Sequence, residues 1–101
     1  MTRRRVRFTA TAREHVRLLK RWWQENSERP EILSHDLEEA IKMLSALPGI
    51  GSPYPSAPIP GIRRFYLERL MSHLYYTFDE HELVIRAAWH ARRGSGPNFG
   101  S

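Results

Sequence analysis

The sequence predicts an α+β fold of the order β-α-α-β-β-β, with a helical hairpin packed on one face of a small, mainly antiparallel twisted sheet. Two observations predict the helices: apolar residues recur at helical spacing in two segments, and a short polar break separates these segments. A third observation predicts the sheet, because three later segments alternate apolar and polar residues between short turns. Helices joined by so short a break pack antiparallel, and strands joined by short turns form a meander.

The size and composition of the chain predict one globular domain. Its 101 residues, 41% of them hydrophobic and 27% charged, are typical of such a domain. We expect this domain to span residues 1–94 and to end in a flexible, glycine-rich tail over residues 95–101. No apolar run approaches the ~18 residues of a membrane span, and the N-terminus lacks the apolar core of a secretory signal. The absence of cysteine excludes disulfides and thiolate chemistry and fits a cytoplasmic location.

The N-terminal part of the chain predicts a short strand followed by a helix. Residues 3–9 alternate arginines with apolar residues, which favours a strand with one apolar face. Thr11 and Glu14 have the spacing of a capping box, which predicts a helix start at this point. The apolar stripe of this helix consists of Ala12, Val16, Leu19 and Trp23. Trp22 widens the stripe; a broad buried face is the favoured explanation, and a position at an edge or under a partner is the alternative.

A second helix and a long loop follow the polar break. Pro30 suits the first turn of this helix, and Pro48 with the following glycine ends it. Its apolar stripe consists of Leu33, Leu37, Ala40, Ile41, Leu44 and Leu47. Residues 48–61 are rich in glycine and proline, but they lack the Lys-Ser/Thr pair and the following helix of a phosphate-binding loop. We therefore expect the loop to have a structural, positioning role.

Residues 62–67, 73–78 and 83–91 predict the three strands of the meander. Strict alternation along the last strand would place Leu83, Ile85, Ala87, Trp89 and Ala91 on the side of the helices. The same alternation would place Arg86, His90 and Arg92 on the opposite side, together with His73 of the preceding strand. This opposite side is expected to be an open sheet face on which basic and polar groups gather.

The charge of the chain is positive and concentrated at both ends. Sixteen Lys and Arg residues against eleven Asp and Glu residues give a net charge of +5, and only Lys20 and Lys42 are lysines. Residues 1–30 carry nine cations and three anions, whereas residues 31–61 carry one cation and four anions. Arginine pairs with phosphates and carboxylates, so we expect an anionic partner, either nucleic acid or an acidic protein segment. The alternative is a solubilising surface charge.

Four segments of the sequence together resemble a known family. They are VRFTATA, DLEEAIKMLSALPGIGSPY, GIRRFYLERLMSHLYYTFD and VIRAAWHARRG. In this order they resemble the RelE/ParE superfamily of toxins from bacterial type II toxin–antitoxin systems, over residues 5–94. The resemblance implies a cytoplasmic toxin that a cognate antitoxin keeps silent, in a 1:1 complex or a larger hetero-oligomer. ParE-like members poison DNA gyrase, whereas RelE-like members cleave mRNA in the ribosomal A site.

The resemblance also points to individual residues. RelE-like nucleases bring basic residues to the open sheet face and often carry a tyrosine near the C-terminus. Arg64 matches a family lysine, but the next equivalent position holds Tyr66, and His73 replaces an arginine of the ribosome-dependent enzymes. Arg92 or Arg93 fits the basic end of the last strand, and the C-terminal tyrosine is absent. These departures favour the ParE-like branch; a RelE-like ribosome-dependent endoribonuclease is the first alternative, and a non-toxic relative that only binds antitoxin or nucleic acid is the second.

The chemistry of the candidate residues allows both catalysis and binding. RNA cleavage by its own 2′-OH needs a general base, a general acid and cations near the phosphate. His73 and His90 titrate near neutrality and, with Arg92, are the catalytic candidates if the chain is a ribonuclease. In the alternative interpretation, the histidines form hydrogen bonds at strand edges while the arginines bind antitoxin carboxylates. The candidates for contact with target or antitoxin are Arg64, Tyr66, Arg86, Arg92, Arg93 and Trp22.

The remaining histidines give no sign of a site. His15, His35 and His81 fall at helical or turn positions, and we expect them at the surface. No group of His, Asp and Glu has the spacing of metal ligands, so neither a metal nor another cofactor is expected.

Overall fold

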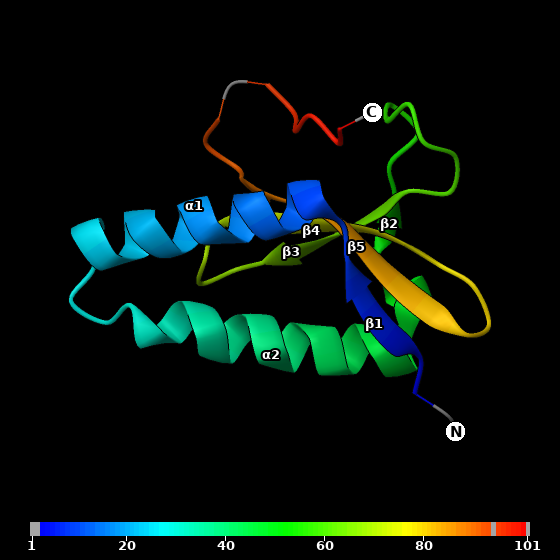
Figure 1. Ribbon diagram of the computed structural model, residues 1–101, viewed down its shortest axis with the longest axis horizontal. Coiled ribbons are helices and arrows are strands. Elements are labelled where there is room, and N and C mark those ends of the chain that lie inside the picture. Colours follow the sequence, from blue (N-terminus) through cyan, green and yellow to red (C-terminus); the bar gives the residue numbers. More distant parts are fainter. Residues whose placement is uncertain (1–2, 94, 101) are drawn as a thin grey trace.

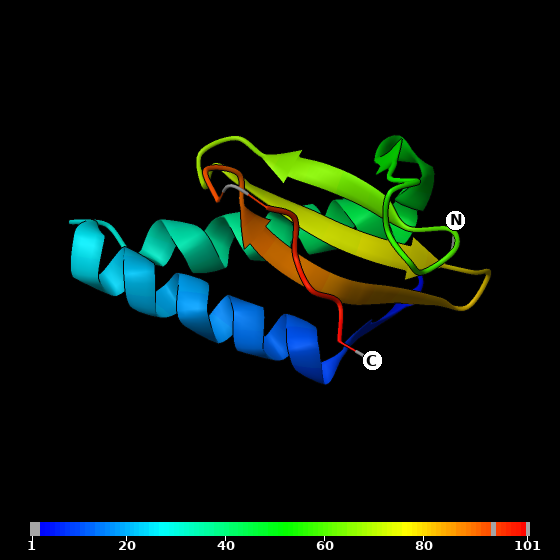
Figure 2. The same ribbon diagram turned by 90° about the horizontal axis from the view of Figure 1, so that it is seen from above.

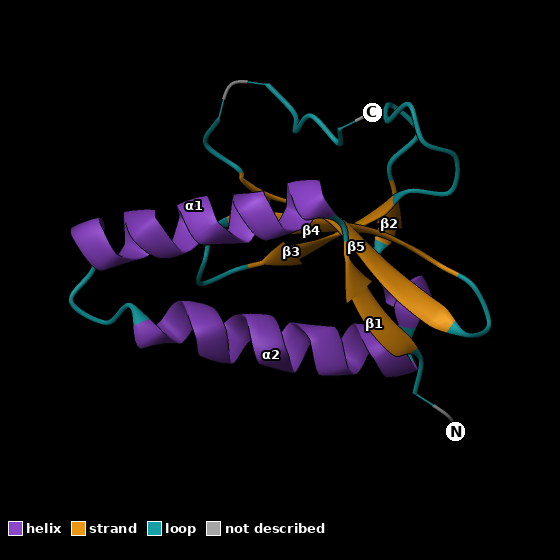
Figure 3. Ribbon diagram, viewed as in Figure 1, coloured by secondary structure: helices purple, strands orange, loops and turns teal. Residues whose placement is uncertain are grey.

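A computed structural model describes residues 3–93 and 95–100 of the chain. The elements in chain order are β1 (Arg5–Phe8), α1 (Ala10–Asn26), α2 (Glu31–Ala46), the 3-10 helix η1 (Pro48–Ile50), β2 (Ser52–Pro53), β3 (Arg63–Leu67), β4 (Ser72–Phe78) and β5 (Glu82–His90). The strands form one five-stranded sheet in the order β1-β5-β4-β3-β2. Only β1 and β5 pair in parallel, and the two helices run antiparallel (Figures 1 and 3). The predicted α+β fold is confirmed, with the short strand β2 as an addition.

The first helix begins two residues earlier than the capping box predicts. Thr9 is the N-cap, and its side-chain oxygen accepts a hydrogen bond from the backbone N–H of Ala12 at 3.1 Å. Thr9 also donates its own backbone N–H to the carbonyl oxygen of Ile85 at 3.0 Å. This hydrogen bond to β5 keeps the backbone of Thr9 extended. Because Thr9 is the last residue bonded to the sheet, α1 starts at the next residue.

The main core lies between the two helices and one face of the sheet. It joins the predicted stripes of both helices to apolar residues of β4 and β5 in one cluster of mostly buried side chains. Leu47 is an exception: it was predicted as part of the stripe, but α2 ends at Ala46, so Leu47 is the C-cap and is 48% exposed. The fully buried members from the strands include Leu74, Tyr76, Leu83 and Ile85. Burial of this apolar area is the main source of the stability of the fold.

Residues 48–51 are tied to the sheet by one buried tyrosine. The Tyr76 hydroxyl donates to the carbonyl oxygen of Pro48 at 2.6 Å and accepts from the backbone N–H of Gly51 at 3.0 Å. A Cβ atom at Gly51 would lie only 2.2 Å from the Tyr76 hydroxyl, so only glycine fits there. These contacts agree with the structural role expected for the loop.

The C-terminal segment crosses the face of the sheet that the helices leave open (Figure 2). Phe99 is 9% exposed and belongs to a second cluster with Ile62, Tyr75 and Ala87. The glycine content predicts a free tail, but the sequence analysis did not foresee the aromatic packing of Phe99. The flexibility of the tail stays a prediction, as does the domain boundary. Residues 1–2, Gly94 and Ser101, which fall within these predictions, lie outside the described residues.

Neither helix in the part of the chain that the structure describes is long and apolar enough to cross a membrane.

Candidate functional site

A β-bulge in β5 decides which side chains reach the open sheet face. Tyr76 pairs with Ile85 and Tyr75 pairs with Ala87, so Arg86 is an extra residue on β5. A bulge of this kind inverts the alternation of the residues that follow it. Residues before the bulge keep their predicted side, whereas those after it exchange sides.

The predicted sides of the second half of β5 are therefore wrong. Ala87 and Trp89 pack in the open-face cluster, although strict alternation places them on the side of the helices. His90 is directed the other way, with its ring 5.6 Å from the ring of Trp22 on α1. His73 stays on the open face, with its ring 4.9 Å from that of Tyr66. The bulge thus separates the two histidines that the sequence places on one face.

The open face carries a polar pocket of about 190 Å³, which we call the open-face pocket. Its lining includes Arg64, His73, Tyr75 and Arg93, together with Tyr54 from the loop before β3. The Arg64 guanidinium lies 5.0 Å from the centre of the Tyr54 ring, and the Arg93 guanidinium lies 4.0 Å from that of Trp89. Stacking on aromatic rings thus positions both of these lining cations.

The electrostatics of the open-face pocket favour an anionic ligand. No acidic residue is among the described residues that line it. Burial lowers the pKa of His73, and the charge of Arg64 lowers it further, so this imidazole is neutral at pH 7. Burial raises the pKa of the Tyr75 hydroxyl, which therefore stays protonated. Two cations and two neutral polar groups can together bind a phosphate or a carboxylate.

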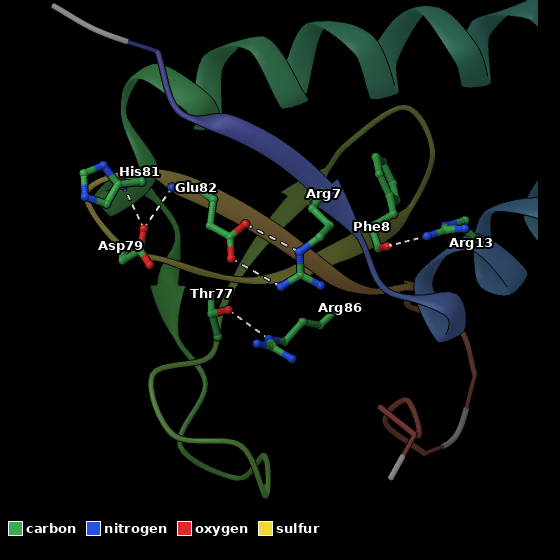
Figure 4. A network of polar contacts seen from close by, with 8 residues as sticks. All are labelled: Arg7, Phe8, Arg13, Thr77, Asp79, His81, Glu82 and Arg86. Carbon is green, nitrogen blue, oxygen red and sulfur yellow. Dashed lines mark hydrogen bonds and ion pairs between the residues drawn. The ribbon is translucent and has the colours of Figure 1, made fainter.

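His90 also lines this pocket, whereas the remaining predicted site residues lie outside it. Arg86 is on the open face at the bulge, where its Nε donates to the Thr77 hydroxyl at 2.8 Å (Figure 4). Tyr66 is 45% exposed on β3. Arg92 is exposed after the end of β5, and its backbone N–H donates to Nδ1 of His90 at 3.2 Å. The roles assigned to these residues stay predictions.

Two expectations about α1 are wrong. Trp22 is 44% exposed, so it is not part of a broad buried face. His15 is 8% exposed, and its Nδ1 accepts the backbone N–H of Ala88 at 3.3 Å. The pairing of β1 with β5 ends at Ile85, so no strand pairs with the Ala88 N–H at the edge of β5. His15 accepts this N–H instead. Local spacing could not reveal this role, because it depends on where α1 crosses the sheet.

Trp22 borders a second cavity, which we call the β5 groove. It lies between α1 and the end of β5 and has a volume of about 300 Å³. Leu18, Trp22, Ala88, His90 and Arg92 are among its lining residues. The floor is apolar, and the arginines after β5 form a basic rim.

Tyr54, Tyr75 and Trp89 line the open-face pocket but were not predicted as site residues. Tyr75 has a signal, since it alternates with His73 and Thr77 on the polar side of its strand. Trp89 reaches the open face only because of the bulge, and Tyr54 arrives from a distant loop. Among the described residues, no three His, Asp or Glu side chains are grouped so as to hold a metal ion.

Three solved structures of toxin–antitoxin systems contain chains with this fold. In the chromosomal ParDE system of P. aeruginosa, the TM-score is 0.67 at 20% identity, over 86% of this chain and 95% of that chain. In the RelBE2 complex of Mycobacterium tuberculosis, the TM-score is 0.62 at 27% identity, over 88% and 99% of the two chains. In the E. coli DinJ-YafQ toxin–antitoxin complex, the TM-score is 0.59 at 14% identity, over 88% of this chain and 93% of that chain.

No family model and no curated protein matches the sequence. The structural similarity spans almost the whole of each neighbouring chain, and it agrees with the four sequence segments noted above. The chain therefore has the fold of the RelE/ParE superfamily of toxins.

Proposed function

We propose that the chain is the toxin of a toxin–antitoxin pair, that it inhibits growth by binding DNA gyrase, as ParE-like toxins do, and that a cognate antitoxin neutralises it. The observation that carries the choice of binding over catalysis is the bulge at Arg86. Both His73 and His90 line the open-face pocket, but the bulge turns the His90 ring toward Trp22 on α1, whereas the His73 ring lies against Tyr66, so the two rings are not aimed at each other as an acid–base pair. The surface instead offers cations and aromatic rings, which suit recognition of an anionic partner.

An antitoxin partner is supported by the neighbours and by the charge of the chain. The neighbouring chains come from toxin–antitoxin complexes. The net charge of +5 and the basic rims of both cavities complement an acidic protein segment. A bound antitoxin would also cover exposed apolar groups such as Trp22.

A ribosome-dependent endoribonuclease is the second candidate, and the open-face pocket favours it. Arg64 and Arg93 can bind the scissile phosphate, and His73, whose lowered pKa keeps its imidazole neutral, can accept a proton as a general base. In this candidate His73 acts without His90. Activity would then depend strongly on His73 and little on His90.

Induced expression in a bacterial host tests these functions. Growth, DNA synthesis and protein synthesis are followed by pulse labelling, with and without the open reading frame next to the gene. If DNA synthesis fails first and co-expression restores growth, gyrase poisoning by an antitoxin-controlled toxin is supported. If protein synthesis stops first and His73→Ala abolishes the effect, the endoribonuclease replaces it. If growth never stops, the chain is a non-toxic binding relative, and the proposal is wrong.

A matched pair of variants then locates the surface involved. Arg64→Glu reverses a cation that lines the open-face pocket and not the β5 groove, whereas Arg29→Glu reverses an exposed cation in the loop between the helices. We expect the first variant to relieve growth arrest and the second to leave it unchanged. Equal effects would show that the open-face pocket does not contact the target.

A further inference from the structure

We propose that the β5 groove binds an extended, acidic segment of the antitoxin, which adds to the free edge of β5 and inserts an apolar side chain beside Trp22. This inference rests on the proposed function for the identity of the partner. The argument for the groove itself comes from three features: the backbone edge, the apolar floor and the basic rim.

The backbone edge of β5 has open hydrogen-bonding groups in this groove. The Ala88 N–H donates to His15 on α1, which shows that the polar backbone groups of Ala88 point away from β4. In an antiparallel pair the groups of residue i+2 point the same way, so those of His90 do so too. The His90 carbonyl accepts from the Arg93 N–H at 3.2 Å. The Ala88 carbonyl and the His90 N–H have no partner within residues 3–93 and 95–100.

These two groups match one residue of an added strand. In a parallel arrangement, a residue opposite Trp89 donates its N–H to the Ala88 carbonyl and accepts the His90 N–H with its own carbonyl. The first half of β5 already pairs in parallel with β1. An added segment would thus continue the pairing of β1 beyond the point where His15 interrupts it. Strand addition of this kind gives affinity through the main chain.

The floor of the groove suits an apolar side chain. Leu18 and Leu19 are aliphatic, and Trp22 stands at the edge with 44% of its surface exposed. A half-exposed tryptophan gains much from being covered, which makes it an efficient anchor at an interface. The volume of about 300 Å³ accommodates one large side chain with its backbone.

The rim of the groove suits a carboxylate. Arg92 and Arg93 line it, and no Asp or Glu is among its described lining residues. His90 adds a further donor: its Nδ1 accepts from the Arg92 N–H, so its proton is on Nε2. This Nε2 is buried and has no hydrogen-bond partner in the described part of the chain. His90 thus contributes an unsatisfied donor to the lining of the groove.

An acidic peptide fits these features better than a nucleic acid strand does. The backbone edge offers one acceptor and one donor in the register of a peptide, and the aliphatic floor has no group that would recognise a base. A nucleic acid would share only the basic rim and the stacking on Trp22. Binding of a nucleic acid is therefore a separate outcome that the experiment distinguishes.

The test uses the full chain and, as the probe, the purified protein encoded by the adjacent open reading frame. Isothermal titration calorimetry compares Trp22→Ala and Arg92→Glu with the controls Leu47→Ala and Arg29→Glu, which change exposed residues that do not line the groove. We expect Trp22→Ala to weaken binding by about 30-fold or more, as loss of a central tryptophan does. We expect about tenfold from Arg92→Glu and less than about twofold from the controls. Hydrogen exchange should show the His90 amide protected in the complex.

The outcomes separate the groove from the proposed function. If the probe binds the wild-type chain but Trp22→Ala and Arg92→Glu bind equally well, the antitoxin lies elsewhere and only the groove is wrong. If the probe neither binds the chain nor relieves growth arrest, the proposed function fails, and the groove with it. If a single-stranded DNA 12-mer binds the wild-type chain and not Trp22→Ala, the groove is a nucleic acid site and the peptide proposal is overturned. Arg92→Glu keeps the test valid if Trp22→Ala does not fold.

Discussion

The two halves of β5 have different neighbours on the side away from β4. Residues 82–85 pair with β1, and Leu83 and Ile85 are buried where alternation predicts. Residues 86–90 begin at the bulge and have α1 beside them instead of a strand, with contacts from Thr9 and His15. A helix can therefore complete the edge of a sheet through side chains where a strand ends.

The difference between the two halves of β5 also explains why the open-face pocket and the β5 groove both lie at the end of this strand. In the second half, the bulge turns the Trp89 side chain to the open face and the His90 ring to the side of α1, so the end of β5 contributes residues to both cavities. A strand without the bulge would have placed both histidines and the arginines on one face.

In the first half, Ile85→Ala should cause a large loss of stability. Ile85 is 0% exposed in the main core, so removal of its side chain leaves a cavity and lowers the free energy of unfolding by about 2–5 kcal/mol. Urea denaturation measures the change. Leu47→Ala, at a residue that is 48% exposed, is the control and should cost less than about 1 kcal/mol. A similar decrease in the free energy of unfolding in both variants would contradict the position of the first half of β5 in the main core.

In the second half, His15→Ala should destabilise the protein by about 1–3 kcal/mol, because the Ala88 N–H would lose its acceptor in a buried place. His15→Asn, which keeps an acceptor, should recover part of the loss. His35→Ala, at an exposed histidine of α2, is the matched control and should change the free energy of unfolding by about 0.5 kcal/mol or less. A His15→Ala protein as stable as the control would show that the Ala88 N–H at the edge of β5 does not need His15 as its acceptor.

Stability should fall when the pH is lowered from 7.5 to 5.5. Burial lowers the pKa of His15, with a smaller contribution from Arg93, and burial also lowers those of His73 and His90. Below the unfolded value of about 6.5, the unfolded chain binds protons that the folded chain does not, which favours unfolding. Urea denaturation at several pH values measures the slope. His15→Asn should reduce the slope, and an unchanged slope would mean that His15 does not contribute to it.

On the open face, Phe99→Ala should lower the free energy of unfolding by about 1–2 kcal/mol. The loss is smaller than in the main core, because Phe99 lies near the chain end and the segment can move to fill the space. Urea denaturation gives the change in stability, and the fluorescence of Trp89 reports exposure of the open face. Asn98→Ala, at an exposed neighbour, is the control. If only the control altered the fluorescence, Phe99 would not be the residue that holds the segment.

The smallest effect is expected from the ion pair between β1 and the first half of β5. Arg7 Nη2 lies 3.3 Å from Glu82 Oε1, and both side chains are partly exposed (Figure 4). Arg7→Gln should therefore cost about 0–1 kcal/mol, and the cost should vanish in high salt. Thermal unfolding at two salt concentrations measures it. A loss as large as that of Ile85→Ala would mean that the pair, and not burial, holds β1.

Much of the fold could be predicted from local patterns. The stripe of α2 and the alternation along β4 each depend only on neighbours in the sequence, and apart from Leu47 at the C-cap of α2 the stripe lies in the core as predicted. Arg64 and His73 could likewise be assigned to the open face, since β3 and β4 have a regular register. The position of His15, the exposure of Trp22 and the packing of Phe99 could not be predicted, because each depends on a segment distant in sequence.

The sequence by itself determined the element order, the basic character of the surface and the resemblance to toxins, because hydrophobic periodicity and composition are local properties. Only the tertiary structure decided which groups share a site. One extra residue in β5 inverts its faces, and no hydrophobic pattern marks it, since Ala87 and Ala88 fit either side. The partner of the Ala88 N–H depends on where β1 ends and α1 crosses. These features arise from pairing between distant segments, and they separate His73 from His90.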